Sequence, residues 1–585
     1  MAVAMAVAVV APAAPSQAKT GTDRTSATEA RRVDSVTKPR IDWFDCSIVT
    51  PRAQCGTVRL PVDYDRPRGA QTEVALFRIR AADPKRRVGS LFLNPGGPGG
   101  SGVQFAASAP DFLSPDLLAR FDIVGVDPRG VNFSDNVRCW RNFAAQAEAL
   151  SGMDVPFPYT KAETRGYVAS SRKFGQACSS TGRPLTAHMS TAQVARDMDV
   201  LRRTLGDRTL TYLGFSYGTY LGQVYANLFP DRVRAIAIDG VLDPIGWAGT
   251  GNTALPQTQR IRSGEGAAKA LREILRRCGT AGPDYCELAR YGDPTQLYDR
   301  IIAALKEAPL TVTDPDTGEV WYTLTYQNLI AMLLSDLYSP SGSSFIDMDL
   351  TFAWTLLSEQ SQPAQKEGAA RSLQRRLAQV FPEQSPTRPT LRATGARAGW
   401  GFPYDNSLET FQTVACTDSR NPRLAAAWQG YAALADRTAP GFGPMWTWAS
   451  APCASSTWTV RDADSYRGPF TRQTARPVLV VGNYWDPATN YDGAVSAAAL
   501  LPNSRLLSSD SWGHTAYGTS GCVTDAVDAY LLRVAVPARG TRCYGDEQPF
   551  TDPLEGEPRP GLRRSAPSRP LPPVVPPLPG STPRG

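Results

Sequence analysis

The sequence predicts an α/β fold, with a mostly parallel, doubly wound β-sheet covered by helices and a large helical insertion. Two observations predict the sheet: short apolar runs recur between residues 74 and 241, and a segment of helical periodicity separates them. Strands that alternate with helices form parallel sheets covered on both faces. A third observation predicts the insertion, because the alternation stops after Pro244 and resumes near Pro477.

The expected strands are runs of apolar and β-branched residues that end at Gly, Pro, Asp or Ser. They read VALFRIRA (74–81), GSLFLNP (89–95), FDIVGVDPRG (121–130), LTYLGFS (210–216), VRAIAIDGV (233–241) and RPVLVVGN (476–483). Residues 191–206 have the period of an amphipathic helix, as do 264–278 and 326–338 within the insertion. An insertion of this size is expected to cap the carboxyl ends of the strands, where ligands bind in such sheets.

The two ends of the chain differ in composition from the rest. An Ala/Val run closing on Ser16-Gln17-Ala18 is typical of a secretory signal peptide, although no basic residues precede it; the alternative is a disordered Ala-rich tail. The last residues are Pro-rich and cannot bury a core. We expect a signal peptide (1–18), a disordered linker (19–40), a first part of the sheet domain (41–244), a helical cap (245–470), a second part of the sheet domain (471–548) and a disordered tail (549–585).

Charge and hydropathy exclude two classes of partner. The net charge is +7, and much of the basic excess lies near the two ends of the chain. No stripe of Lys and Arg with interleaved aromatic residues occurs in the body, so we expect no nucleic-acid partner. Beyond the N-terminal run no apolar segment approaches the ~20 residues that span a bilayer, so we expect no stable membrane span.

The cysteines indicate an exported protein. There are 10 of them, an even number, and no C-x-x-C pair suggests zinc. They fall as near neighbours, and local loop closure favours pairing them as Cys46–Cys55, Cys139–Cys178, Cys278–Cys286, Cys416–Cys453 and Cys522–Cys543. Disulfides persist in oxidising compartments, so the expected location is secreted, extracellular or cell-wall associated. With only 2 histidines, an imidazole-based metal site is not expected, nor is any cofactor.

The segment Gly214-Phe215-Ser216-Tyr217-Gly218 has the G-x-S-x-G pattern of a nucleophile elbow. By itself the pattern is weak, and the alternative is an ordinary glycine turn. The context strengthens it, because an apolar strand leads in and a helical pattern leads out. Small residues on both sides allow the sharp turn that exposes Ser216 at the strand tip.

A serine needs a base, and the chain offers His188 and His514. His514 follows the last expected strand, which matches the chain order serine, acid, histidine, so we assign it as the base and His188 as structural. The acid should lie between Ser216 and His514 at a strand end. Asp486 and Asp239 both meet that description.

Six segments in order (NPGGPGG, DPRGVNFS, GFSYGTYLG, DGVLDP, LVVGNYWDPAT and WGHTA) resemble the secreted tripeptidyl aminopeptidase group of the proline iminopeptidase-like α/β-hydrolases. The resemblance runs from about residue 41 to about residue 545. It implies an α/β-hydrolase fold with a TAP-like C-terminal region and favours Asp486 over Asp239 as the acid. It also implies an oxyanion hole at Gly96, Gly97 and Tyr217, although the related iminopeptidases carry His where this chain has Pro95.

The resemblance implies an exported serine exopeptidase. Such an enzyme would remove tripeptides, other short peptides or single residues from peptide substrates with a free N-terminus, through an acyl-enzyme on Ser216. A carboxylate should then pair with the substrate ammonium group, and the cap candidates are Glu265, Asp284, Glu287, Asp336 and Asp418. Asp418 ranks first because TVACTDS resembles a segment of the family. The alternatives are an esterase or lactonase with the same triad and a non-catalytic binding protein on the same scaffold.

Overall fold

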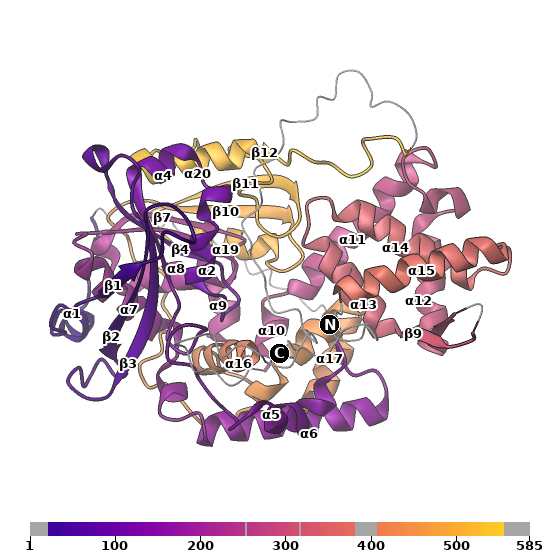
Figure 1. Cartoon of the computed structure of the whole chain (residues 1–585), viewed down its shortest axis with the longest axis horizontal. Helices are drawn as coiled ribbons and strands as arrows, with labels where there is room; N and C mark the ends of the chain where they lie inside the picture. The colour runs from indigo at the N-terminus through magenta and orange to yellow at the C-terminus, as the bar shows by residue number, and fades with distance from the viewer. Residues whose placement is uncertain (1–20, 252–253, 315–316, 381–405, 555–585) are drawn as a thin grey trace, which may run out of the picture.

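The computed structural model describes residues 21–251, 254–314, 317–380 and 406–554. The expected signal peptide (1–18) and all but the first residues of the expected tail lie outside this range. A large sheet with its helices forms one side of the molecule, and helices of the insertion form the other (Figure 1).

The sheet has 10 strands in the order β1-β2-β3-β5-β4-β6-β7-β10-β11-β12. The strands are β1 (Asp42–Asp45), β2 (Ala53–Pro61), β3 (Gln71–Ile79), β4 (Gly89–Asn94), β5 (Phe121–Val126), β6 (Leu210–Phe215), β7 (Val233–Asp239), β10 (Val478–Trp485), β11 (Ser504–Trp512) and β12 (Arg542–Tyr544). Strands β1, β2, β3 and β5 pair antiparallel, and every pair from β5 onward is parallel. The expected mostly parallel sheet with an α/β-hydrolase architecture is confirmed.

Helices cover both faces of the sheet, which is why β4 and β6 are buried along their whole length. One face packs under α1 (Ala27–Asp34), α7 (Thr191–Thr204), α8 (Tyr217–Leu228) and α19 (Tyr491–Leu500). The other packs under α2 (Gly102–Ala107), α3 (Ala109–Phe112), α4 (Pro115–Arg120) and α20 (Gly521–Arg533). The two apolar layers hold the parallel strands rigid, so their carboxyl ends form a fixed platform.

The insertion between β7 and β10 is mainly helical. It contains α9 (Pro244–Ala248), α10 (Gln257–Arg260), α11 (Ser263–Ala281), α12 (Pro294–Glu307), α13 (Tyr326–Leu337), α14 (Gly342–Leu357), α15 (Pro363–Val380), α16 (Ser407–Asp418), α17 (Trp428–Asp436), α18 (Phe442–Ala449) and a hairpin of β8 (Leu310–Thr313) and β9 (Val320–Leu324). We call residues 245–470 the cap. Two helices from before β6, α5 (Phe143–Leu150) and α6 (Lys161–Ser180), lie beside the cap (Figure 1). Tyr167 of α6 packs on Trp448 of α18, so the layer over the sheet has two sources in the chain.

The expectation of a disordered linker at 19–40 is wrong for its described part. Residues Ala27–Asp34 form α1, which begins at the N-cap Ser26. Val33 is fully buried, and Glu29 accepts two hydrogen bonds from the buried Arg196 of α7. A polar segment therefore folds because one apolar stripe and one ion pair attach it to α7.

The structure brings each of the five neighbouring cysteine pairs together as a disulfide. They link Cys46–Cys55, Cys139–Cys178, Cys278–Cys286, Cys416–Cys453 and Cys522–Cys543. Five disulfides are typical of a protein that folds in an oxidising compartment. Among the described residues, none of the helices is both long enough and apolar enough to cross a bilayer.

Candidate active site

Ser216 lies on a sharp turn between β6 and α8. Its backbone has φ 55° and ψ −126°, a strained conformation for a residue with a side chain. Glycine is required on both sides: a Cβ on Gly214 would come within 2.4 Å of the Tyr212 ring, and one on Gly218 within 2.7 Å of the Asn94 side chain. The G-x-S-x-G pattern is thus a packing requirement that holds Ser216 at the strand tip.

Asp486 and His514 meet at the ends of the neighbouring strands β10 and β11. Nδ1 of His514 lies 2.9 Å from both carboxylate oxygens of Asp486. The carboxylate also accepts hydrogen bonds from the N–H groups of Ala488 and Thr489 at 2.9 and 2.8 Å and from the Thr489 hydroxyl at 2.8 Å. Burial favours the neutral acid, but the imidazole and these donors outweigh it and lower the pKa of Asp486. Asp486 is therefore held as an anion against the histidine.

The turn after β7 brings Ser216 and His514 to the same place. The N–H of Ser216 donates to the carbonyl of Asp239 at 3.0 Å, and a Cβ on the next residue, Gly240, would lie 3.2 Å from Cε1 of His514. Because Asp486 occupies Nδ1, Nε2 is the ring atom left to accept a proton. Nε2 is buried and has no hydrogen-bond partner in the described part of the chain. The hydrogen bond between a catalytic base and its nucleophile is often long or absent without substrate and tightens when substrate binds.

Asp239, the second candidate for the acid, has a different partner. Its carboxylate accepts the N–H groups of Ala516 at 3.0 Å and Tyr517 at 2.7 Å, just beyond the histidine. Full burial raises the pKa of Asp239 to about 6. The structure thus places Asp486 on the imidazole and Asp239 on the backbone that carries it.

The histidine loop is strained and held from several sides. Gly513 has φ 86° and Thr515 has φ 74°, which is rare for a β-branched residue. The side-chain amide of Asn483 donates to the carbonyls of Gly513 at 2.8 Å and Thr515 at 3.3 Å, on either side of His514. Sequence reasoning missed Asn483, because an asparagine at the end of an apolar strand carries no recognisable signal.

The Gly-rich loop after β4 lies directly against Ser216. A Cβ on Gly96 would come within 2.7 Å of Cβ of Ser216 and 3.0 Å of the Tyr217 nitrogen, and Gly96 has φ 97°. The N–H of Gly96 donates to the Asn94 side chain at 3.0 Å, which changes its expected role: Gly96 supplies close approach rather than a free donor. In the described part of the chain, the N–H groups of Gly97 and Tyr217 have no hydrogen-bond partner. These two amides are the donors that could stabilise an oxyanion.

A buried carboxylate fixes the far end of this loop. Asp127, which follows β5, accepts the hydroxyl of Ser101 at 2.6 Å and the N–H groups of Val103 at 2.9 Å and Phe133 at 2.9 Å. Burial raises the pKa of Asp127 to about 6 despite these donors. The DPRG segment thus anchors α2 and, through it, the Gly-rich loop.

Comparison with known proteins agrees with this site. A family model described as "alpha/beta hydrolase fold" matches residues 89–264, and one described as "TAP-like protein" matches residues 439–543. The chain is 30% identical to a tripeptidyl aminopeptidase of Streptomyces coelicolor over 515 residues, which cover 86% of each chain. The chain belongs to the tripeptidyl aminopeptidase-like α/β-hydrolases.

Two further relatives show how names vary among these hydrolases. Serine protease Hip1 of Mycobacterium tuberculosis is 29% identical over 86% of this chain and 91% of its own. Carboxylesterase B of the same organism is 32% identical over 87% of this chain and 91% of its own. The TAP-like match begins at residue 439, earlier than the expected second part of the sheet domain (471–548), so it includes the last cap helix, α18.

Asp418 does not lie where a substrate could reach it. It is fully buried, and its carboxylate accepts the N–H of Thr191 at 2.7 Å, the hydroxyl of Thr191 at 2.6 Å and the indole N–H of Trp247 at 3.0 Å. The Thr191 hydroxyl also lies 2.5 Å from the Tyr217 hydroxyl. Burial raises the pKa of Asp418 to about 6. The expected role of Asp418 as the ammonium partner is therefore not supported; the residue ties cap helix α16 to α7 and, through Thr191, to Tyr217.

The other cap carboxylates also have protein partners or face outward. Asp336 pairs with Arg376 at 2.5 Å, and Glu265 with Arg262 at 2.6 Å. Glu287 pairs with Arg290, and Asp284 is exposed. His188 ends a short 3₁₀ turn whose carbonyl accepts the buried Arg129, consistent with a structural role.

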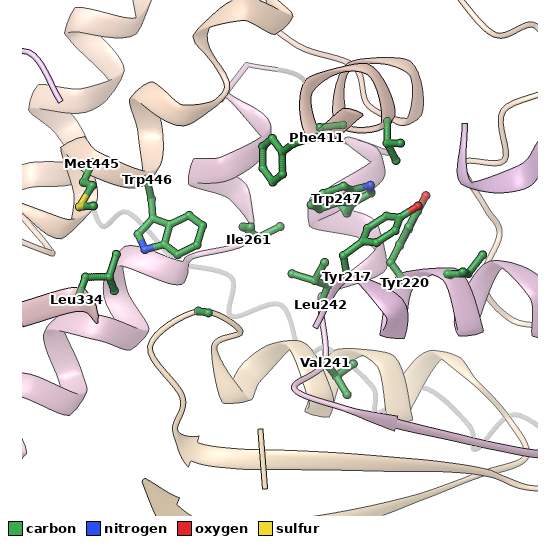
Figure 2. Close-up of a cluster of buried hydrophobic side chains, with 14 of the residues drawn as sticks. Tyr217, Tyr220, Val241, Leu242, Trp247, Ile261, Leu334, Phe411, Met445 and Trp446 are labelled. Atoms are coloured by element: carbon green, nitrogen blue, oxygen red, sulfur yellow. The ribbon is translucent and has the colours of Figure 1, made fainter. Parts of the chain in front are cut away.

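Aromatic cap residues lie close to the residue after Ser216. Figure 2 shows Phe411 of α16 and Trp247 of α9 above Tyr217 and Leu242, with Trp446 of α18 farther to the left, beyond Ile261. The rings of Tyr217 and Trp247 are 5.5 Å apart. The cap thus packs directly on Tyr217, the residue that follows Ser216.

Proposed function

We propose that this serine hydrolase is an exported aminopeptidase that releases tripeptides, other short peptides or single residues from free N-termini. Its relatives named tripeptidyl aminopeptidase and serine protease support this proposal. The observation that carries it is the depth of the nucleophile: Ser216 is only 5% exposed beneath the cap. A covered nucleophile favours a chain end over the middle of a folded polypeptide.

The proposed triad of Ser216, Asp486 and His514 performs acyl transfer in two halves. Oγ of Ser216 attacks the scissile carbonyl while Nε2 of His514 takes its proton. The carbonyl oxygen becomes an anion facing the N–H groups of Gly97 and Tyr217. Collapse of this intermediate breaks the C–N bond, and His514 returns the proton to the leaving amine. Water then attacks the ester, His514 takes its proton, and Ser216 leaves protonated, which restores the enzyme.

Three contacts between sheet and cap support a covered site. A Cβ on Gly99 of the Gly-rich loop would lie 2.6 Å from the hydroxyl of Thr410 on α16. The hydroxyl of Ser263 on α11 donates to the carbonyl of Ala488, beside the catalytic acid. The cap turn at Tyr338 contacts the histidine loop. The cap therefore touches the loops that bear the oxyanion donors, the acid and the base.

The test compares matched peptides with free and acetylated N-termini, with products identified by mass. If the site recognises an ammonium group, acetylation removes a charge-assisted hydrogen bond of ~1.5–3 kcal/mol, and kcat/KM should fall ~10–100-fold. Ser216→Ala serves as the inactive control. Equal cleavage of both forms would contradict the aminopeptidase proposal.

An esterase acting on small molecules is the second candidate, because a relative of 32% identity is named carboxylesterase. Short acyl esters offered to the same preparation distinguish the two. Turnover of esters without turnover of any peptide would favour this candidate, and Ser216→Ala should abolish either activity.

A further inference from the structure

The turn that ends cap helix α13 touches the catalytic histidine loop at three points. The carbonyl of Tyr338 accepts the N–H of His514 at 3.0 Å, and the two rings lie edge to face with centroids 5.1 Å apart and planes at 72°. Gly513 lies so close to this turn that a Cβ would come within 2.8 Å of the Pro340 nitrogen and 2.9 Å of the Tyr338 carbonyl oxygen. The cap backbone is therefore in direct contact with the residue before the base and with the base itself.

We propose that Tyr338 is a positioning residue for His514, so that the orientation of the catalytic imidazole is set by the cap as well as by the sheet. The proposal rests on the triad proposed above.

The sheet alone leaves one part of the histidine unsupported. Asp486 holds Nδ1, but a contact at one ring nitrogen leaves the ring free to tilt about it. The loop backbone is strained at Thr515, and strain persists only where the surroundings over-determine it. Asn483, Asp486 and Asp239 bind the peptide groups before and after the histidine. The N–H of His514 itself donates to the Tyr338 carbonyl, and the Tyr338 ring packs edge to face with the imidazole.

An ion cluster fixes the end of α13 from the opposite direction. Arg376 of α15 donates to Asp336 at 2.5 Å and to both oxygens of Asp349 of α14 at 3.0 Å. Asp336 lies two residues before Tyr338 and is almost fully buried. Three cap helices thus converge on the turn, which makes it a rigid support rather than a mobile loop end.

The ring, not the hydroxyl, makes the contact. The hydroxyl of Tyr338 is buried and has no hydrogen-bond partner within the described residues. An unpaired buried hydroxyl destabilises a protein, so it adds nothing to the positioning. This gives a matched pair of variants: Tyr338→Phe keeps the ring and removes the hydroxyl, and Tyr338→Leu keeps apolar volume and removes the ring.

Two readouts test the proposal on the full chain. The first is the rate at which a fluorophosphonate labels the serine between pH 5 and 9. We expect the labelling rate of Tyr338→Phe to stay within about twofold of the parent. Tyr338→Leu should label at least ~10-fold more slowly, and the acid side of its pH–rate profile should be displaced, because a small misplacement of a base lowers the rate by this factor or more. Parent-like labelling and pH profile in Tyr338→Leu would overturn the proposal, as would an equal loss in Tyr338→Phe.

The second readout does not depend on activity. The chain has 2 histidines, so ¹⁵N-histidine labelling gives signals from two imidazole rings, and those of His188 report on folding. We expect the Nδ1–H resonance of His514 to be unchanged in Tyr338→Phe and shifted or broadened in Tyr338→Leu. An unchanged resonance in a folded Tyr338→Leu protein would refute positioning. If Tyr338→Leu does not fold, Tyr338→Met takes its place with the same expected outcomes.

Failure of the proposed triad is separately visible. Ser216→Ala should lose fluorophosphonate labelling. Labelling that survives in Ser216→Ala would refute the triad, whereas the imidazole signals would still decide whether Tyr338 orients His514.

Discussion

Replacing Asp486 with asparagine should nearly abolish turnover, whereas the same change at Asp239 should leave most of it. Asparagine keeps the size of the side chain but exchanges one oxygen for an NH₂ group. In Asp486 the first oxygen accepts two backbone N–H groups, at 2.9 and 2.8 Å, and the second accepts the N–H of Thr515 at 3.1 Å. The NH₂ group will therefore replace the second oxygen, since the opposite orientation leaves an additional buried donor unpaired at ~1–3 kcal/mol.

Nδ1 of His514 lies 2.9 Å from both of these positions, so the NH₂ group competes with the remaining oxygen for Nδ1. Where the ring accepts from the NH₂ group at Nδ1, its proton lies on Nε2, and the ring cannot take the proton of Ser216. A wrong tautomer of this kind lowers kcat ~10⁴-fold, or about 5.5 kcal/mol at tenfold per 1.4 kcal/mol. At Asp239 both backbone amides donate to the same oxygen, which an asparagine carbonyl can replace, so Asp239→Asn should cost stability only through its buried NH₂ group and reduce kcat less than about tenfold.

Stopped-flow labelling by a fluorophosphonate and steady-state kcat on one peptide or ester measure both variants, with thermal melting as the control for folding. A folded Asp486→Asn protein within tenfold of the parent would refute the assignment of the acid. An Asp239→Asn protein as inactive as Asp486→Asn would refute the separation of roles.

Three further predictions follow from the same structure. The pKa of Asp127 is raised from 3.8 to about 6, so this residue stabilises the folded protein below pH ~4, and about 3 kcal/mol of that stability is lost as the pH rises through about 6. In chemical denaturation at a series of pH values, Asp127→Asn should not show this loss. Parallel plots of unfolding free energy against pH for the parent and Asp127→Asn would contradict the prediction. Replacing Cys522 and Cys543 by serine removes the covalent link between α20 and β12 and should lower the free energy of unfolding by ~2–4 kcal/mol in denaturant titrations. An unchanged denaturation midpoint would contradict this expectation. His514→Ala should lose turnover by orders of magnitude while His188→Ala retains it, and equal losses would show that the base is misassigned.

Apart from β3, the strands that sequence reasoning found are buried along most of their length on both faces. Strands β4, β6, β7 and β10 lie inside the parallel sheet, so each is a continuous apolar run that ends at a turn residue. The elbow at Ser216 was recognisable because its G-x-S-x-G pattern lies between an apolar strand and a helical pattern. With 2 histidines in the chain, the choice of base was also narrow.

Strand β11 shows why other elements could not be predicted. Its residues Ser504–Trp512 include a polar run that has no local reason to extend. Neighbouring elements satisfy some of these groups: the hydroxyls of Tyr491 on α19 and Ser508 lie 2.7 Å apart, and the indole of Trp485 on β10 donates to Asp510 at 2.7 Å. Helix α1 is similar, since its ion pair with Arg196 joins residues 167 positions apart. Tertiary partners decide these elements, and local periodicity does not reveal them.

The same limit applies to the supports of the site. Asn483 and Tyr338 act on His514 only because β10 and the end of α13 meet the histidine loop in space. Asp418 resembled a substrate-binding residue in its sequence context, yet its neighbours Thr191 and Trp247 fill its hydrogen-bonding capacity. Titratable and nucleophilic residues can be found from the sequence, but packing decides which of them face the substrate.

The pairing of β10 with β7 has a consequence for the order in which the enzyme matures. In the sheet, Val478 lies beside Ile236, so the chain must accommodate the whole cap before these neighbours can meet. Contacts this distant along the chain form late, because long loops must close first. The proposed nucleophile, Ser216, belongs to the early strands, whereas the proposed acid and base, Asp486 and His514, arrive with β10 and β11. A growing or half-folded chain therefore carries a serine without its proton acceptor, and hydrolytic activity begins only when the last strands dock.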